Sequence, residues 1–145
     1  MAALTNYAET KVLELLFENA DWTNIGDAGG ITGSSTAGNF YIALFTADPT
    51  DAGTQTNEAD YTSYARVAVA RSGSGWSTTG DTCDNVATIS FPECTGGSNT
   101  VTHVGIMDAS TGGNMVIHGA LTSSLAISSG ITPQIPAGDL DITAA

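Results

Sequence analysis

Two histidines are the side chains of this chain best suited to bind a metal ion, and both fall in one predicted hairpin. His103 and His118 are the only histidines among 145 residues. If Met107 pairs with Asn114 across a Gly-rich turn, His103 lies directly opposite His118 on one face of the sheet. Two ligands do not make a metal site, and neither histidine has an HxH or HExxH spacing. We therefore predict a half-exposed histidine pair at a contact between subunits.

Acidic side chains offer two further candidate sites. The loop 48–60 contains hard oxygen ligands of the kind that Ca²⁺ prefers, but their spacing does not follow the EF-hand pattern, so we interpret it as a solvated loop. Asp139 and Asp141 occupy alternate positions of a predicted strand, which would hold their carboxylates about 7 Å apart. A glycosidase could use that separation, but nothing nearby predicts a cleft lined by aromatic side chains. The sequence therefore predicts no catalytic residue, no metal site and no cofactor.

The two cysteines are predicted to be free or bonded between subunits. Cys83 and Cys94 flank a predicted strand over residues 86–91. Such a strand would hold the sulfurs roughly 20–30 Å apart, whereas a disulfide needs Cα atoms within about 7 Å. The absence of a CxxC motif excludes a redox or zinc-ribbon site.

One helix is predicted near the N-terminus, over about residues 5–19, with Thr5 as its N-cap. The apolar positions that share one stripe of this helix are Ala8, Val12, Leu15 and Leu16, widened by Leu13 and Phe17. Two interpretations stay open. The helix packs on its own domain, or it docks on a neighbouring subunit through Val12, Leu15 and Leu16.

Beyond a Gly-rich loop at about 21–39, apolar residues alternate with a period of two, which predicts β-strands. We expect strands over residues 40–46, 64–71, 86–91, 100–107 and 114–121, with shorter strands at 125–127 and 140–142. The second strand would turn Ala65, Val67 and Val69 inward and Arg66 outward, and residues 73–80 would form a turn that carries Trp76. The fold class predicted is mainly β: an antiparallel β-sandwich of about seven strands (about 40–143) with one N-terminal α-helix, in a single domain over residues 1–145.

The charge of the chain excludes two classes of partner. Lys11, Arg66 and Arg71 are the only basic residues beside 15 acidic ones, which gives a net charge of −12. Because each phosphate contact needs a cation, nucleic-acid binding is not expected, and anionic membrane surfaces are disfavoured for the same reason. No apolar run approaches the ~20 residues that a membrane span needs. The composition favours a protein that works through its shape and surface.

The order of the motifs resembles a known group of proteins. The segments that carry the resemblance are NYAETKVLELLF, NFYIALFTADPTDAGT, YARVAVAR, TVTHVGIMDASTGGNMVIHGAL and IPAGDLDIT. They resemble small virion proteins of tailed bacteriophages, labelled tail-fibre-like or head decoration proteins. The resemblance covers most of the chain, and it implies a structural virion protein without catalytic residues.

Within that group, small acidic β-rich proteins resemble the cement proteins that clamp the capsid lattice. We therefore predict a capsid cement protein on the outer capsid surface, with the major capsid protein as partner and a homo-oligomer, a trimer, as the assembled form. Two alternatives stay open: a tail or tail-fibre component for tail assembly or host attachment, and a small glycan-binding or hydrolytic module. A receptor binder would expose loop aromatics, for which the candidates are Trp22, Tyr61, Tyr64 and Trp76.

Overall fold

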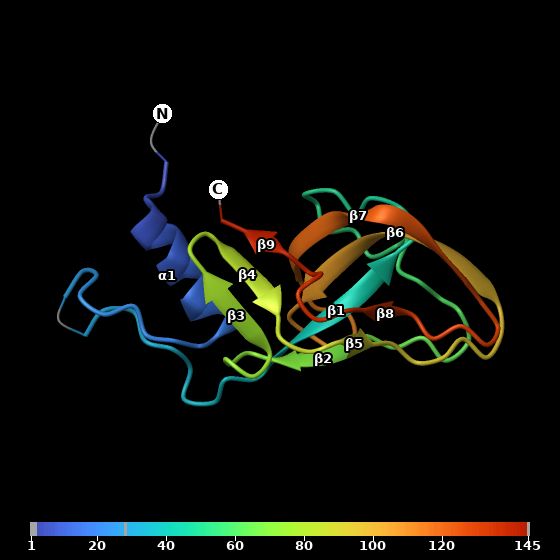
Figure 1. Cartoon of the computed structure of the whole chain (residues 1–145), viewed down its shortest axis with the longest axis horizontal. Helices are drawn as coiled ribbons and strands as arrows, with labels where there is room; N and C mark the ends of the chain where they lie inside the picture. The colour runs from blue at the N-terminus through green and yellow to red at the C-terminus, as the bar shows by residue number, and fades with distance from the viewer. Residues whose placement is uncertain (1–2, 28, 145) are drawn as a thin grey trace. The chain divides into compact units, whose positions relative to one another are not determined.

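Nine strands and one helix make up the regular structure of residues 3–27 and 29–144, the part of the chain that the computed structural model describes (Figure 1). The elements are α1 (Asn6–Phe17), β1 (Asn39–Phe45), β2 (Val67–Ala70), β3 (Trp76–Thr79), β4 (Thr82–Asn85), β5 (Ile89–Ser90), β6 (Ser98–Met107), β7 (Met115–Ser128), β8 (Gln134–Ile135) and β9 (Ile142–Thr143). They form sheets in the orders β2-β1-β6-β7, β3-β4-β9 and β5-β8. The prediction of a mainly β, antiparallel fold with one N-terminal helix is confirmed.

The chain divides into two compact units, each built from segments that are distant in sequence. Unit 1 contains Met1–Asn39, Ala70–Ile89 and Ile135–Ala145, and unit 2 contains Phe40–Val69 and Ser90–Gln134. The single domain predicted over residues 1–145 stays a prediction. Within the described residues, no helix has the length and apolar character needed to cross a bilayer.

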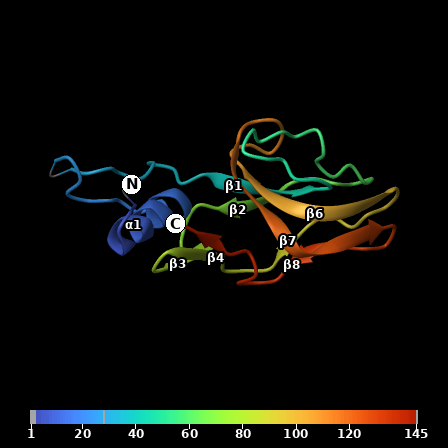
Figure 2. The same ribbon diagram turned by 90° about the horizontal axis from the view of Figure 1, so that it is seen from above.

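In unit 1, α1 begins at the predicted cap and packs against β3 and β4 (Figure 2). The Oγ1 atom of Thr5 accepts a hydrogen bond from the Ala8 N–H at 3.4 Å. Leu13 and Phe17 are buried, with 3% and 0% of their surface exposed. The Phe17 ring packs on the Trp76 ring with the ring centroids 4.8 Å apart. This aromatic contact fixes the face of α1 that unit 1 uses.

The buried residues of α1, Leu13 and Phe17, are the two that widen the predicted stripe, and its central residues are not the buried ones. Val12 and Leu15 are only half-buried, and Leu16 is 36% exposed. Successive residues of an α-helix are turned by about 100°, so Leu13 and Phe17 lie to one side of that stripe. The predicted contact residues of α1 therefore remain partly open on its outer side.

The predicted turn over residues 73–80 is only partly correct, because residues 73–75 form a turn but Trp76 starts a strand. β3 pairs with β4 in antiparallel register, and Trp76 lies opposite Asn85. Trp76 has 0% of its surface exposed. Burial of its large apolar ring stabilises the strand by more than the preference of the surrounding Gly and Ser residues for a turn. The chain reverses instead at Gly80 and Asp81, between the paired Thr79 and Thr82.

In unit 2, β1 is buried on both faces, as its uninterrupted apolar sequence predicts. Ile42 and Leu44 point to one face, Ala43 and Phe45 to the other, and all four are at most 2% exposed. Phe45 packs in a cluster with Ala43 and Met107. β1 therefore forms the centre of the four-stranded sheet, between β2 and β6.

The predicted register of the β6–β7 hairpin is wrong by one or two residues near the turn and by five at Val101, which pairs with Leu125. Met107 pairs with Met115 and Ile106 with Ile117, so one extra residue of β7 bulges between the two pairs. His103 consequently lies opposite Ala120 and not opposite His118. The bulge lets Met107 and Met115 share a face, which a regular hairpin closed by Met107 and Asn114 would not allow.

Other predicted strands differ in length from the observed ones. β2 begins at Val67 rather than at residue 64, β5 is only Ile89–Ser90, and β9 is only Ile142–Thr143. β7 continues to Ser128 and absorbs the separate strand predicted at 125–127. Val86, the predicted start of the third strand, is 44% exposed. Prediction from the alternation of apolar residues therefore overestimates the length of a strand where a turn interrupts the pairing.

Both cysteines are free thiols, in agreement with the prediction, although the strand between them is much shorter than expected. Cys83 and Cys94 have 0% of their surface exposed. Burial raises the pKa of the Cys83 thiol, which keeps it protonated and unreactive. A bond between subunits would need these side chains to leave the interior.

Substitutions in α1 test which of its faces stabilises unit 1. Leu13→Ala removes buried methyl groups and should lower the free energy of unfolding by about 2–5 kcal/mol. Leu16→Ala, on the exposed side, should change it by less than about 1 kcal/mol. Urea unfolding of both variants measures the difference, and equal losses would contradict the observed face.

Candidate functional site

A buried arginine organises the loops of unit 2. Only 4% of the Arg66 side chain is exposed, and it lies immediately before β2. The prediction that Arg66 points outward and Ala65 inward is wrong, since Ala65 is exposed. Strand alternation does not apply here because the regular pairing starts only at Val67. The cation is instead drawn inward by acceptors from two other segments.

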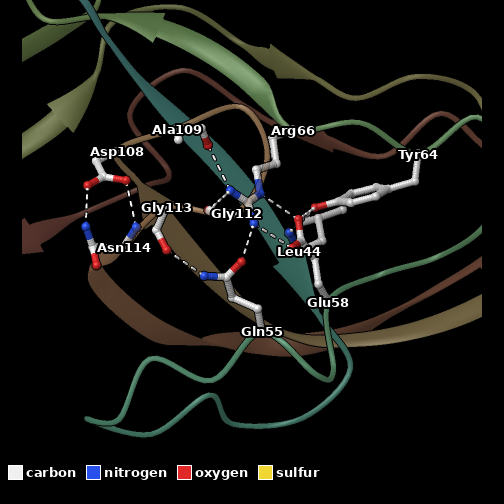
Figure 3. Close-up of polar contacts among 10 residues, drawn as sticks. All are labelled: Leu44, Gln55, Glu58, Tyr64, Arg66, Asp108, Ala109, Gly112, Gly113 and Asn114. Carbon is white, nitrogen blue, oxygen red and sulfur yellow. Dashed lines mark hydrogen bonds and ion pairs between the residues drawn. The ribbon is translucent and has the colours of Figure 1, made fainter.

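All five N–H donors of the Arg66 guanidinium are used (Figure 3). Nε donates to Glu58 Oε1 and Nη2 to Glu58 Oε2, both at 2.7 Å. Nη2 also donates to Gln55 Oε1 at 3.0 Å. Nη1 donates to the carbonyl oxygens of Ala109 and Gly112, both at 2.8 Å. This two-pronged carboxylate contact is the geometry for which guanidinium is suited and ammonium is not.

Backbone pairing and a tyrosine hold Glu58 in place. Glu58 forms an antiparallel bridge with Phe45 at the end of β1. Tyr64 Oη donates to Glu58 Oε1 at 2.9 Å and accepts from the Leu44 N–H at 3.0 Å. Burial raises the pKa of Tyr64 well above its usual range, so the phenol stays neutral. The hydrogen bond to Glu58 raises the pKa of Arg66, which is charged in any case.

The turn between β6 and β7 has the shape that the sequence predicts, with two glycines at positive φ. Gly112 and Gly113 have φ of +58° and +70°. A Cβ atom on Gly113 would come within 2.3 Å of the Asp108 carboxylate, so no other residue fits. Asp108 Oδ1 and Oδ2 accept from the Asn114 N–H and Nδ2 at 2.7 and 2.9 Å. These bonds lower the pKa of Asp108.

We call Gln55, Glu58, Tyr64, Arg66 and the turn 108–114 the Arg66 cluster. Gln55 links its two halves, because Nε2 donates to the Gly113 carbonyl at 2.9 Å while Oε1 accepts from Arg66. An open hollow of about 420 Å³ lies over the cluster. Its walls include Glu58, Tyr64 and Arg66, whose polar groups already bond to one another. The cluster is therefore built to join loops rather than to hold a charged ligand.

The two histidines predicted as a facing pair have separate surroundings. His118 lies between two carboxylates: its Nδ1 is 3.4 Å from Asp48 Oδ1, and its Nε2 is 3.4 Å from Asp51 Oδ1. His103 contacts its neighbour, with Nδ1 2.9 Å from Thr102 Oγ1. Among residues 3–27 and 29–144, no three His, Cys, Asp or Glu side chains form a group that could hold a metal ion.

The acidic loop 48–60 bonds to its own unit. Asp48 Oδ1 accepts from the Thr50 N–H at 2.8 Å, and Asp60 Oδ1 accepts from Asn99 Nδ2 at 2.9 Å. Together with the contacts of Glu58 and Asp51, these bonds give most of the loop's carboxylates a partner within unit 2. The loop thus differs from a cage of converging oxygens around a cation.

The carboxylate pair predicted from Asp139 and Asp141 is replaced by another. Asp139 lies in a turn, with its N–H donating to the Pro136 carbonyl at 3.2 Å, and not in a strand. Asp141 neighbours Asp84 of β4, and burial together with this neighbour raises the pKa of Asp84.

Sequence reasoning missed Arg66, Glu58 and Gln55 as a connected set. The available signal was scarcity, because Arg66 is one of only three basic residues in the chain. A lone cation among 15 acidic side chains has many possible partners, so the sequence does not say which one it takes.

Arg66→Met tests the cluster, because it leaves the largely buried Glu58 carboxylate without its cation and with Tyr64 as its remaining described side-chain donor. We expect the free energy of unfolding to fall by about 3–5 kcal/mol. Arg66→Lys should recover only part of this loss, since one ammonium cannot reach all four acceptor residues. Lys11→Met removes the ion pair with Glu14, whose side chains are 30% and 26% exposed, and should change the melting temperature far less than Arg66→Met does. Equal effects of the Arg66 and Lys11 variants would contradict the cluster's role.

Asp84→Asn tests the acidic pair through the pH dependence of stability. The folded state raises the pKa of Asp84 above its unfolded value, so it favours the protonated carboxyl. The contribution of the protonated carboxyl to the free energy of unfolding is present at low pH and is lost as pH rises through the pKa of the folded state. Asp84→Asn should therefore raise the melting temperature at pH 7 and have little effect near pH 3. A lower melting temperature at pH 7 would contradict the pairing.

Comparison with known proteins assigns the chain to a family. The family model of podophage GP4 fiber I protein gp80 matches residues 3–143. No curated protein matches the chain. The resemblance to virion proteins of tailed phages is thus confirmed, and the prediction of a capsid cement protein is wrong, because the matching family is one of fibre proteins. A fibre protein is a structural component and not an enzyme, and its implied partners are tail and fibre proteins in place of the major capsid protein. The chain belongs to the podophage GP4 fiber I protein gp80 family.

Proposed function

We propose that this chain is an assembly subunit of the tail fibre, which binds neighbouring fibre and tail proteins and does not itself contact the host receptor. The proposal rests on the burial of the aromatic side chains that the sequence suggests as candidates for receptor binding. Trp76 and Tyr61 are 0% and 3% exposed. Receptor glycans are commonly bound by aromatic rings that stand open in loops, and these two rings are part of the interior.

The other two candidates also make internal contacts. Tyr64 uses its hydroxyl for Glu58 and Leu44, and its ring lies parallel to the Phe91 ring, with centroids 6.5 Å apart. Trp22 is half-buried and meets Tyr7 edge to face, with ring centroids 6.2 Å apart. None of the four presents an open stacking platform of the kind a sugar ring needs. This supports assembly over host attachment.

The outer side of α1 is the surface that we propose for contact with another fibre or tail protein. On α1, Leu16 is 36% exposed on this side, and Tyr7, about 180° around the helix from Leu16, is 60% exposed. Leu4 and Ile31, outside α1, are 51% and 44% exposed. Val12 and Leu15 are half-buried beside Leu16. Because the chain carries a net charge of −12, a partner with a basic rim around an apolar centre fits it best.

Self-association is a further part of the proposal. The trimer that the sequence predicts stays a prediction and competes with a two-fold dimer as the assembled form. The role of His103 and His118 at a subunit contact also stays a prediction. His118 is already engaged by Asp48 and Asp51, which makes it the weaker contact residue of the two. Closed symmetry is the usual form of such assemblies.

Incorporation into phage particles tests the proposed function. Virions made with Leu16→Asp should lack this protein in their fibres, because a charge would enter the apolar contact. Val86→Asp is the matched control: Val86 is 44% exposed and lies outside α1, so this variant should be incorporated normally. Immunogold labelling and quantitative mass spectrometry of purified particles measure both.

Two outcomes would contradict the proposal. Normal incorporation of a folded Leu16→Asp variant would exclude the α1 contact. Receptor binding by the isolated wild-type chain, measured on host cells or host surface glycans, would favour host attachment over assembly.

A further inference from the structure

The four-stranded sheet of unit 2 ends in an unusually long free edge. In the order β2-β1-β6-β7, β7 is the last strand, and within the described residues its only paired neighbour is β6. β7 has 14 residues (Met115–Ser128), whereas most strands have about 3–10. The opposite edge strand, β2, has four. The long edge therefore offers many more backbone groups for pairing.

The hydrogen bonds of β1 show whether the N–H and carbonyl groups of each β6 residue point toward β1 or toward β7. Leu44 lies opposite Val104, yet the Leu44 N–H donates to Tyr64 Oη and its carbonyl accepts from the Ala59 N–H. Leu44 thus directs its backbone groups away from β6. In an antiparallel ladder, residues alternate between facing the partner and facing away, so Val104 directs its own groups toward β7.

The same alternation identifies the outward groups of β7. Val104 pairs with Gly119, so the Gly119 N–H and carbonyl face β6. His118 and Ala120 flank Gly119 and therefore direct their N–H and carbonyl groups to the free edge. Among the described residues, no backbone hydrogen bond of a turn or loop uses these groups. They are donors and acceptors placed for another strand.

The edge of β7 lacks the side chains that usually prevent such pairing. Monomeric proteins protect edge strands with charged residues, Pro or a covering segment. Met115–Ser128 contains no Lys, Arg, Asp, Glu or Pro. Two shifts in register, between Ile106 and Met107 and between Val101 and His103 of the partner strand, interrupt the pairing of β7, so its regular arm is residues 117–120. That arm carries the outward groups of His118 and Ala120.

A second copy of this chain is the partner that fits the edge. Two copies of a chain with net charge −12 repel each other, so their contact should involve few acidic side chains. β7 itself carries none, and two neighbouring carboxylates, those of Asp48 and Asp51, each lie 3.4 Å from the His118 ring. Antiparallel pairing around a two-fold axis brings two identical edges of equal length together. Pairing of β7 with the four-residue β2 of another copy would leave most of the edge open.

We propose that β7 pairs with β7 of a second copy, so that two four-stranded sheets become one continuous eight-stranded sheet. The inference rests on the proposed role as an assembly subunit and gives that role a contact surface. Main-chain hydrogen bonds supply the contact, as in other cases of strand addition.

Substitutions at Ala120 test the proposal in the full chain. By light scattering after gel filtration, the wild type should have the mass of two chains. Ala120→Pro removes the outward N–H, which an edge strand tolerates, and should give one chain with unchanged circular dichroism. Ala120→Val keeps the N–H and should stay dimeric. Ala120→Glu keeps the N–H but adds like charges at the contact, and should weaken the dimer at least tenfold.

Amide hydrogen exchange of the wild type provides a test that needs no variant. Exchange at Ala120 should slow as protein concentration rises through the dimer range, while exchange at Gly119, which is bonded within the chain, should not change. A monomer at all concentrations, a mass of three chains, a folded dimeric Ala120→Pro, or concentration-independent exchange at Ala120 would overturn the pairing. A monomeric chain that still enters fibres would overturn only the pairing and leave the proposed function standing.

Discussion

The two-pronged contact between Arg66 and Glu58 is the interaction on which the loops of unit 2 depend. A guanidinium can be withdrawn from water only if its donors are paired, and here acceptors come from Glu58, Gln55 and two carbonyls of the turn 108–114. Moving any one of these segments would leave a buried charge unsatisfied. The loop after β1, the start of β2 and the β6–β7 turn are thus fixed together, although each is irregular by itself.

This arrangement suits a structural protein of the fibre. Described polar groups that the sequence suggests as candidates for chemistry or binding bond to other groups of the chain: His118 to two carboxylates, and Tyr64 to Glu58. What remains available lies elsewhere, in the apolar side chains along α1 and the uncharged backbone edge of β7. Both suit contacts with other proteins, which is the work expected of a fibre component.

The sequence predicted what depends on local pattern. The Thr5 cap, the buried strand β1 and the glycine turn before β7 follow from residue type and period alone. The errors arise where distant contacts decide. Phe17 draws Trp76 into a strand, and the pairing of Met107 with Met115 forces a bulge that separates His103 from His118. Arg66 was placed outside because only its partners, 8 to 46 residues away, make burial favourable. The prediction of a cement function was wrong for a different reason. An acidic composition and a small size are shared by head and tail proteins, so they do not distinguish between the two.

Hydrogen exchange at the Arg66 side chain tests the central claim most directly. In ¹⁵N-labelled protein, the Nε–H of Arg66 gives its own NMR signal, and its exchange rate reports how often the guanidinium opens to water. If Arg66 locks the loops, this proton should exchange as slowly as the backbone amides of β1, and at the same rate as the Asn114 amide in the turn. Rapid exchange at Arg66 alongside slow exchange in β1 would contradict the account. The contacts of Arg66 would then open often while the strands stay closed, so they could not be what holds the loops in place.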